Sequence, residues 1–219
     1  MKILKSIAVI LFLFQSTGQV MAFDLKGKLD SLTGGGDSSE AFDLKGGKTQ
    51  LMEAFYESSG NYLKALEHLL EAYGLNVEAA QVKATIDNYG KNSNASEADQ
   101  MENSIKATTE ASQALEKKMK AKGNMVSAEG KIAFAKALPP AGKGLAGTIK
   151  LAPISSQMVS QVSANPLSAI KEIGGVSKIT PKLPGYMQTI QKVTKLIISG
   201  AKANDIEGAA DLEADLGDL

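Results

Sequence analysis

The stretch from Thr49 to Gly74, TQLMEAFYESSGNYLKALEHLLEAYG, decides the fold of this chain. Its apolar and small residues recur at spacings of four and three, which places them on one face of a helix. These residues are Leu51, Phe55, Ser58, Tyr62, Leu66, Leu69 and Tyr73. Thr49 is a residue type that caps helix N-termini, and Gly74 is the type that ends helices. The stretch therefore predicts a long amphipathic helix, with Gly60 as the point where it kinks.

Two further helices are predicted after this stretch. One runs from Asn76, its expected cap, to Tyr89. The other begins at Ser96, where Ser96 and Asp99 have the spacing of a capping box, and continues to Gly123. Its heptad positions are Met101, Ile105, Thr108, Ser112, Leu115 and Met119. Because two of these are polar, the seam indicates either a marginal internal packing surface or an adaptable groove for a partner protein.

The second half of the chain contains all of the prolines. Short helices are predicted near 125–138, 143–152, 154–164 and 166–173, and a longer one over 185–203. No run of alternating β-branched residues is long enough to predict a sheet. The predicted fold class is therefore all-α: a helical domain over 49–203, built as a bundle of about five to seven helices. A flexible arm over 23–48 precedes it, and an acidic, disordered tail over 204–219 follows it.

The first 22 residues have the plan of a secretory signal peptide. Lys2 and Lys5 are followed by an apolar run from Ile7 to Phe14, which is too short to span a bilayer comfortably. Val20-Met21-Ala22 offers apolar or small residues at the positions that a signal peptidase reads. We expect cleavage after Ala22 and an exported, periplasmic or secreted protein, with an uncleaved membrane anchor as the alternative.

The arm contains the pentapeptide Phe-Asp-Leu-Lys-Gly twice, at 23–27 and at 42–46. A glycine- and serine-rich run, Thr33 to Ser39, separates the two copies and is typical of a linker. The duplication indicates either a short docking motif presented twice or a duplicated linker fragment.

Composition excludes several classes of function. The chain has no cysteine, which removes disulfides and thiolate metal sites and favours a bacterial envelope protein over a disulfide-rich secreted domain. All of its basic residues are lysine, and it has no tryptophan. Because arginine is the preferred reader of phosphates and bases, and aromatic residues are few, we expect no nucleic-acid partner.

Three short motifs match known sites but lack the required context. Gly142-Lys143-Gly144-Leu145-Ala146-Gly147 has dinucleotide-binding spacing, yet Pro139-Pro140 precedes it where a strand is needed, so we interpret its glycines as allowing close helix approach. Gly46-Gly47-Lys48-Thr49 ends like a phosphate-binding loop but has Phe42 in place of the first glycine. Ser168-Ala169-Ile170-Lys171 lacks the partner motifs of penicillin-recognising enzymes.

His68 is the only histidine, with Glu71 three residues later. One histidine and one carboxylate are too few ligands for a zinc site, and we interpret His68 as a surface residue. No set of nucleophile, base and orienting group can be assembled from these residue types. The sequence predicts no enzyme activity, no metal and no cofactor.

Charge is divided strongly along the chain. Residues 23–116 carry 8 lysines and 16 acids, residues 117–202 carry 14 lysines and two acids, and the segment from 203 carries six acids and no lysine. The basic region predicts peripheral contact with anionic envelope lipid, through Lys143, Lys150, Lys192 and Lys195. The alternative is an exported adaptor or structural protein that binds a partner protein through the arm and the heptad helix, and ordinary internal charge balance would also account for the division.

Overall fold

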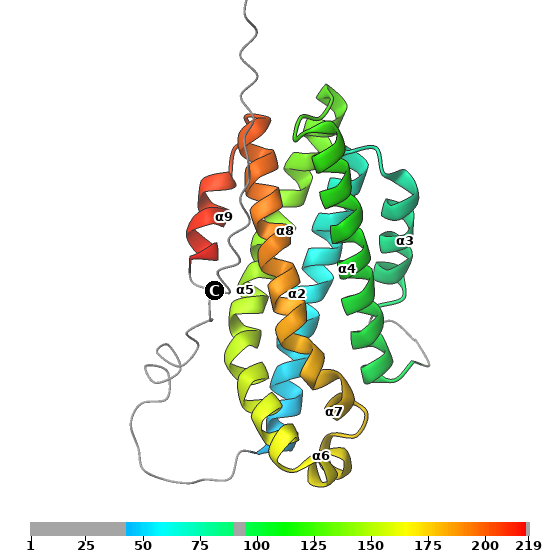
Figure 1. Cartoon of the computed structure of the whole chain (residues 1–219), viewed down its shortest axis with the longest axis vertical. Helices are drawn as coiled ribbons and strands as arrows, with labels where there is room; N and C mark the ends of the chain where they lie inside the picture. Colours follow the sequence, from blue (N-terminus) through cyan, green and yellow to red (C-terminus); the bar gives the residue numbers. More distant parts are fainter. Residues whose placement is uncertain (1–42, 90–94, 218–219) are drawn as a thin grey trace, which may run out of the picture. The chain divides into compact units, whose positions relative to one another are not determined.

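Helix α2 (Leu44–Ala72) contacts α3, α4, α5 and α6 and forms the centre of the fold (Figure 1). The computed structural model describes residues 43–89 and 95–217. All seven residues of the apolar stripe predicted for this helix are buried. Burial of so continuous a stripe is the main stabilising contribution expected of a helix at the centre of a bundle, because it removes the most apolar surface from water.

The N-terminus of α2 lies earlier in the chain than the sequence predicted. Asp43 is the N-cap, and its side chain accepts a hydrogen bond of 3.0 Å from the backbone N–H of Lys45. The predicted cap at Thr49 is wrong, because Thr49 lies inside the helix and its hydroxyl donates to the carbonyl of Lys45. Gly60 does not interrupt the helix. The second copy of the pentapeptide thus provides the cap Asp43 and the first helical residues of α2, so the prediction of a flexible arm is wrong for residues 43–48. Residues 23–42 of the predicted arm and the predicted signal peptide lie outside the described residues.

Helices α3 (Asn76–Asp87) and α4 (Glu97–Lys122) confirm the two helices predicted after Gly74. Asn76 is the first helical residue of α3 and does not cap it. The predicted capping box of α4 is confirmed: the hydroxyl of Ser96 accepts from the backbone N–H of Asp99 at 3.2 Å, and the carboxylate of Asp99 accepts from the backbone N–H of Ser96 at 3.3 Å.

Helix α5 (Ala128–Ala164) corrects the prediction of three short helices over 125–164. Pro139, Pro140 and Pro153 all lie inside this one helix. The helix runs antiparallel to α2: Gly130 approaches Ala72, and Gly147 approaches Ser58. We attribute its continuity to this long packing contact, which outweighs the local cost of each proline.

The remaining elements are α6 (Pro166–Ile173), α7 (Val176–Ile179), the 3-10 helix η1 (Thr180–Lys182), α8 (Leu183–Ala203) and α9 (Ala209–Leu216). Helix α6 has the bounds predicted from the sequence. Helix α9 corrects the expectation of a disordered tail, because Ala209 and Leu212 are buried and α9 packs against α8 and α5. The helical domain therefore extends from Leu44 to Leu216 rather than from 49 to 203.

The described residues form an all-helical bundle without strands, which confirms the predicted fold class. Figure 1 shows α4, α5 and α8 running alongside α2, with α3 and α9 on opposite outer sides. Hydroxyl groups link the helices inside the core: Ser58 of α2 lies 2.6 Å from the hydroxyl of Thr148 on α5 and 3.2 Å from that of Tyr186 on α8. These bonds satisfy polar groups that would otherwise be costly to bury.

Candidate anionic-surface contact

The four lysines predicted to contact an anionic surface lie in exposed positions on two helices. Lys143 and Lys150 are two turns apart on α5, and Lys192 and Lys195 are one turn apart on α8. The ammonium group of Lys150 lies 2.9 and 3.1 Å from the carboxylate oxygens of Glu57 on α2. The structure therefore places two of the four lysines on α5 and two on α8. One of the four, Lys150, already forms an ion pair with Glu57.

A denser group of lysines lies where α4 ends and α5 begins. Residues 117–136 contain six lysines and a single acid, Glu129. The lysines are Lys117, Lys118, Lys120, Lys122, Lys131 and Lys136. We call residues 117–136 the basic tip. Only Lys120 has a carboxylate within 4.0 Å among the described residues, that of Glu116 at 2.5 Å. Lys120 and Lys122, in the last turn of α4, also interact favourably with the negative end of its helix dipole.

Exposed apolar side chains lie among these lysines. Met125, in the connection between α4 and α5, is 64% exposed, and Ile132, in the second turn of α5, is also 64% exposed. Single exposed apolar residues are common on soluble proteins, but apolar and basic residues together are the composition of interfacial membrane contacts. The sequence prediction missed this feature because it considered lysines by region and not by their neighbours.

Hydrogen bonds from the ends of α2 and α8 fix the connection that carries Met125. The carbonyl of Asn124 accepts from the hydroxyl of Tyr73 at 2.9 Å and from the side-chain amide of Asn204 at 2.6 Å. The backbone N–H of Val126 donates to the side-chain oxygen of Asn204 at 3.0 Å, and the Asn124 side chain donates to Ser199 at 2.8 Å. Burial raises the pKa of Tyr73 to about 12, so its hydroxyl keeps its proton near neutral pH. Met125 therefore projects from a well-held loop.

A groove of about 420 Å³ lies beside this connection. Its lining includes Tyr73 and Gly74 from the end of α2, Lys118 and Lys122 from α4, and Met125. Two acids, Glu71 and Glu129, line it as well. The groove is thus amphiphilic and open to solvent next to the basic tip.

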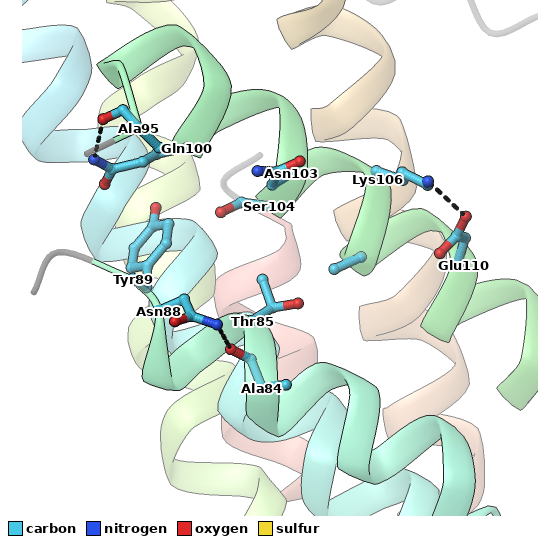
Figure 2. Close-up of a pocket in the computed structure, with 11 residues that line it drawn as sticks. Ala84, Thr85, Asn88, Tyr89, Ala95, Gln100, Asn103, Ser104, Lys106 and Glu110 are labelled. Carbon is cyan, nitrogen blue, oxygen red and sulfur yellow. Dashed lines mark hydrogen bonds and ion pairs between the residues drawn. The ribbon is translucent and has the colours of Figure 1, made fainter. Parts of the chain in front are cut away.

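A second opening lies between α3 and α4, with a volume of about 350 Å³ (Figure 2). Its lining is mostly neutral and polar, and includes Tyr89, Gln100, Asn103 and Ser104. The hydroxyl of Ser104 is buried and has no partner within hydrogen-bond geometry among the described atoms. The side-chain amide of Gln100 donates to the carbonyl of Ala95 at 3.1 Å. Within the described ranges, no basic side chain is hydrogen-bonded to the Ser104 hydroxyl to activate it as a nucleophile. The opening also lies outside the basic region of residues 117–202.

The glycine and serine motifs that resemble known sites have structural roles in the fold. Gly142 to Gly147 lies inside α5, and a Cβ on Gly144 would approach the Tyr62 ring to 2.5 Å, which supports the interpretation of close helix approach. The hydroxyl of Ser168 donates to Glu172 at 2.9 Å. His68 is partly exposed and lies 3.4 Å from Glu71. No group of three metal-ligating side chains occurs in residues 43–89 and 95–217.

The heptad seam of α4 packs inside the chain. Met101, Thr108, Ser112, Leu115 and Met119 are buried, and Ile105 packs against the core. This corrects the hypothesis of a free partner-binding groove on that face, because α2 and α8 pack against α4. The arm, which the adaptor alternative also uses, lies outside the described residues up to 42.

No helix in the described part of the chain is both long and apolar enough to cross a membrane. No family model, curated protein or solved structure matches the chain.

Proposed function

We propose that this chain is a non-enzymatic helical protein, exported to the bacterial envelope or exterior, that binds anionic lipid peripherally through residues 117–202. The proposal rests on how few lysines in this region have a carboxylate partner. Four of its fourteen lysines, Lys120, Lys150, Lys182 and Lys202, have a carboxylate within 4.0 Å among the described residues. The other ten have none there, so much of the positive charge is available to an external anionic surface.

Internal charge balance is the competing explanation, and it accounts for part of the pattern. Lys150 pairs with Glu57, Lys182 pairs with Glu102, and Lys202 pairs with Glu213 of α9. These pairs join the basic region to acids elsewhere in the fold. All three are solvent-exposed, and such pairs contribute about 0 to 1 kcal/mol each. They involve three of the fourteen lysines, so most of the lysine excess has no paired acid elsewhere in the described fold.

Binding to lipid vesicles should depend on both lipid charge and salt. We expect the protein to float with vesicles containing about 30 mol% phosphatidylglycerol at low salt, because each lysine near such a surface contributes about 1 kcal/mol. Raising the salt from about 10 mM to about 150 mM should weaken binding by roughly tenfold or more, since the Debye length falls from about 30 to about 8 Å. Equal partitioning to neutral phosphatidylcholine vesicles, unaffected by salt, would contradict the proposal and leave internal balance as the explanation.

The export part of the proposal makes a separate prediction. Full-length protein expressed in a Gram-negative host should accumulate outside the cytoplasm with an intact mass that corresponds to a chain beginning at Phe23. Mass spectrometry of the periplasmic fraction measures this directly. A mature protein that retains Met1 to Ala22 would show that the processing prediction is wrong, without bearing on lipid binding by the helical domain.

A further inference from the structure

We propose that the protein meets an anionic phospholipid bilayer end-on, with the basic tip at the surface and Met125 and Ile132 inserted between headgroups. This inference rests on the proposed function and specifies its docking face. It selects the lysines of residues 117–136 over the predicted four, Lys143, Lys150, Lys192 and Lys195. The partner chemistry follows from the tip itself, which joins unneutralised lysines to exposed apolar side chains.

The acids near the tip offset part of its charge but leave an excess of lysine, because residues 117–136 carry six lysines and a single acid. Asp205 and Glu207, just after Asn204, are exposed acids at the same end of the fold. Glu116 pairs with Lys120 at 2.5 Å, and Glu71 lies 3.4 Å from His68. The carboxylate of Glu129 accepts hydrogen bonds from its own backbone N–H and from Ser127, which lowers its pKa and keeps it ionised, so it offsets one lysine charge of the tip. The lysines left without a carboxylate within 4.0 Å among the described residues are Lys117, Lys118, Lys122, Lys131 and Lys136. Charge complementarity therefore favours an anionic surface at this end.

The held connection makes Met125 suited to insertion. Its two neighbours, Asn124 and Val126, are fixed by Tyr73, Ser199 and Asn204, so the loop can present Met125 without first ordering itself. A preorganised loop avoids the entropic cost that a mobile loop meets on binding. The methionine side chain is apolar and flexible, and it adapts to irregular surroundings such as an acyl–headgroup boundary.

The predicted lysines are too far along their helices to act together with the tip. Lys143 follows Lys136, the last lysine of the tip, by seven positions, or about 10 Å, and Lys192 precedes the last residue of α8 by eleven, or about 16 Å. Both separations exceed the Debye length of about 8 Å at physiological salt. End-on docking through the tip and side-on docking through the predicted lysines are thus distinct geometries.

Two sets of lysine substitutions with equal charge change distinguish these geometries. Lys117→Gln, Lys118→Gln and Lys122→Gln together should weaken binding to phosphatidylglycerol vesicles by about tenfold or more. Lys143→Gln, Lys192→Gln and Lys195→Gln together should weaken it by less than about threefold, because these lysines stay beyond the screening distance. The reverse order of effects would overturn end-on docking while leaving the proposed function intact.

Insertion is tested with a single tryptophan, because the natural chain has none. In Met125→Trp, fluorescence emission should shift to the blue and be quenched by brominated lipid when phosphatidylglycerol vesicles are added. The matched control is Leu167→Trp on α6, where the native side chain is 78% exposed and lies outside the tip; its emission should not change. A shift at Leu167→Trp alone, or at neither position although the protein binds, would overturn the inference.

Truncation of the apolar side chains provides an independent measure. Met125→Ser with Ile132→Ser should weaken vesicle binding by about tenfold or more, since transfer of two apolar side chains into the interface contributes at least one decade of affinity. Leu167→Ser with Ile170→Ser, the matched exposed pair on α6, should change it by less than about twofold.

If wild-type protein bound no anionic vesicle, the proposed function and this inference would fail together. A Met125→Trp shift with polyglutamate but not with vesicles would assign the tip to an acidic protein and overturn lipid docking.

Discussion

Gly147→Ala is expected to destabilise the protein by about 3 kcal/mol or more, the largest effect that we predict for a single added methyl group. A Cβ at Gly147 would lie 2.6 Å from the backbone nitrogen of Ser58 and 2.9 Å from its Cα. These are main-chain atoms of the central helix α2, which cannot move aside as a flexible side chain can. Relief of the clash would require α2 and α5 to separate along their contact, which opens the core.

Urea unfolding followed by far-ultraviolet circular dichroism measures this change. Gly142→Ala is the matched control, because Gly142 lies in the same helix and a Cβ there would meet nothing within 4 Å. It should stabilise the protein by about 0.5 to 1 kcal/mol through helix propensity. Destabilisation by both variants, or by neither, would contradict the close approach of α5 to α2 at Gly147.

The glycine motif shows how far sequence reasoning could go at this contact. Its failed nucleotide-binding context indicated close helix approach, and Gly144 and Gly147 confirm that interpretation. Gly142 belongs to the same motif, but a Cβ there would meet nothing within 4 Å. Sequence spacing gives which residues share a face of α5, but which glycine meets the α2 backbone depends on the rotation of one helix against the other.

Proline was the signal that misled the prediction of α5. Pro139 and Pro140 predicted a helix end because an interior proline lacks the N–H donor and clashes with the preceding turn. In the structure the carbonyl left without its donor by Pro139 belongs to Ala135, which is an exposed residue. The local sequence predicts the destabilisation that each proline causes in a helix. The contact with α2 that compensates for it is tertiary, so the prolines do not reveal it.

The candidate site was only half accessible to sequence reasoning. The division of charge is plain in the sequence, and it directed attention to residues 117–202. What turns part of that region into a tip is the fixing of residues 124–126 by Tyr73 and Asn204, which lie 51 and 80 positions from Asn124. No periodicity records such distant hydrogen bonds. Similarly, the acidic composition of α9 predicted disorder, but Ala209 and Leu212 find buried positions.

Asn204→Ala is the second prediction with a large effect, a loss of about 2 to 3 kcal/mol of stability. Asn204 is 1% exposed, and its side chain makes three hydrogen bonds. The amide donates to the carbonyls of Asn124 and Gly200, and the oxygen accepts from the backbone N–H of Val126. Alanine leaves that N–H and the Gly200 carbonyl without these partners, and a partly buried donor without a partner costs more than the bond itself contributed.

Asn88→Ala is the matched control, because Asn88 also follows a helix and donates to the carbonyl four residues earlier, that of Ala84 at 2.8 Å, but in an exposed position. Its change in unfolding free energy should stay below about 0.5 kcal/mol, since water replaces the lost bond.

Hydrogen exchange adds a local readout: in Asn204→Ala the amide of Val126 should lose protection while amides in the middle of α2 keep theirs. Because the same loop presents Met125, this variant should also weaken binding to phosphatidylglycerol vesicles under conditions where it remains folded. Unchanged stability and unchanged Val126 protection would show that Asn204 does not hold the connection, and would remove the preorganised loop from the argument for insertion.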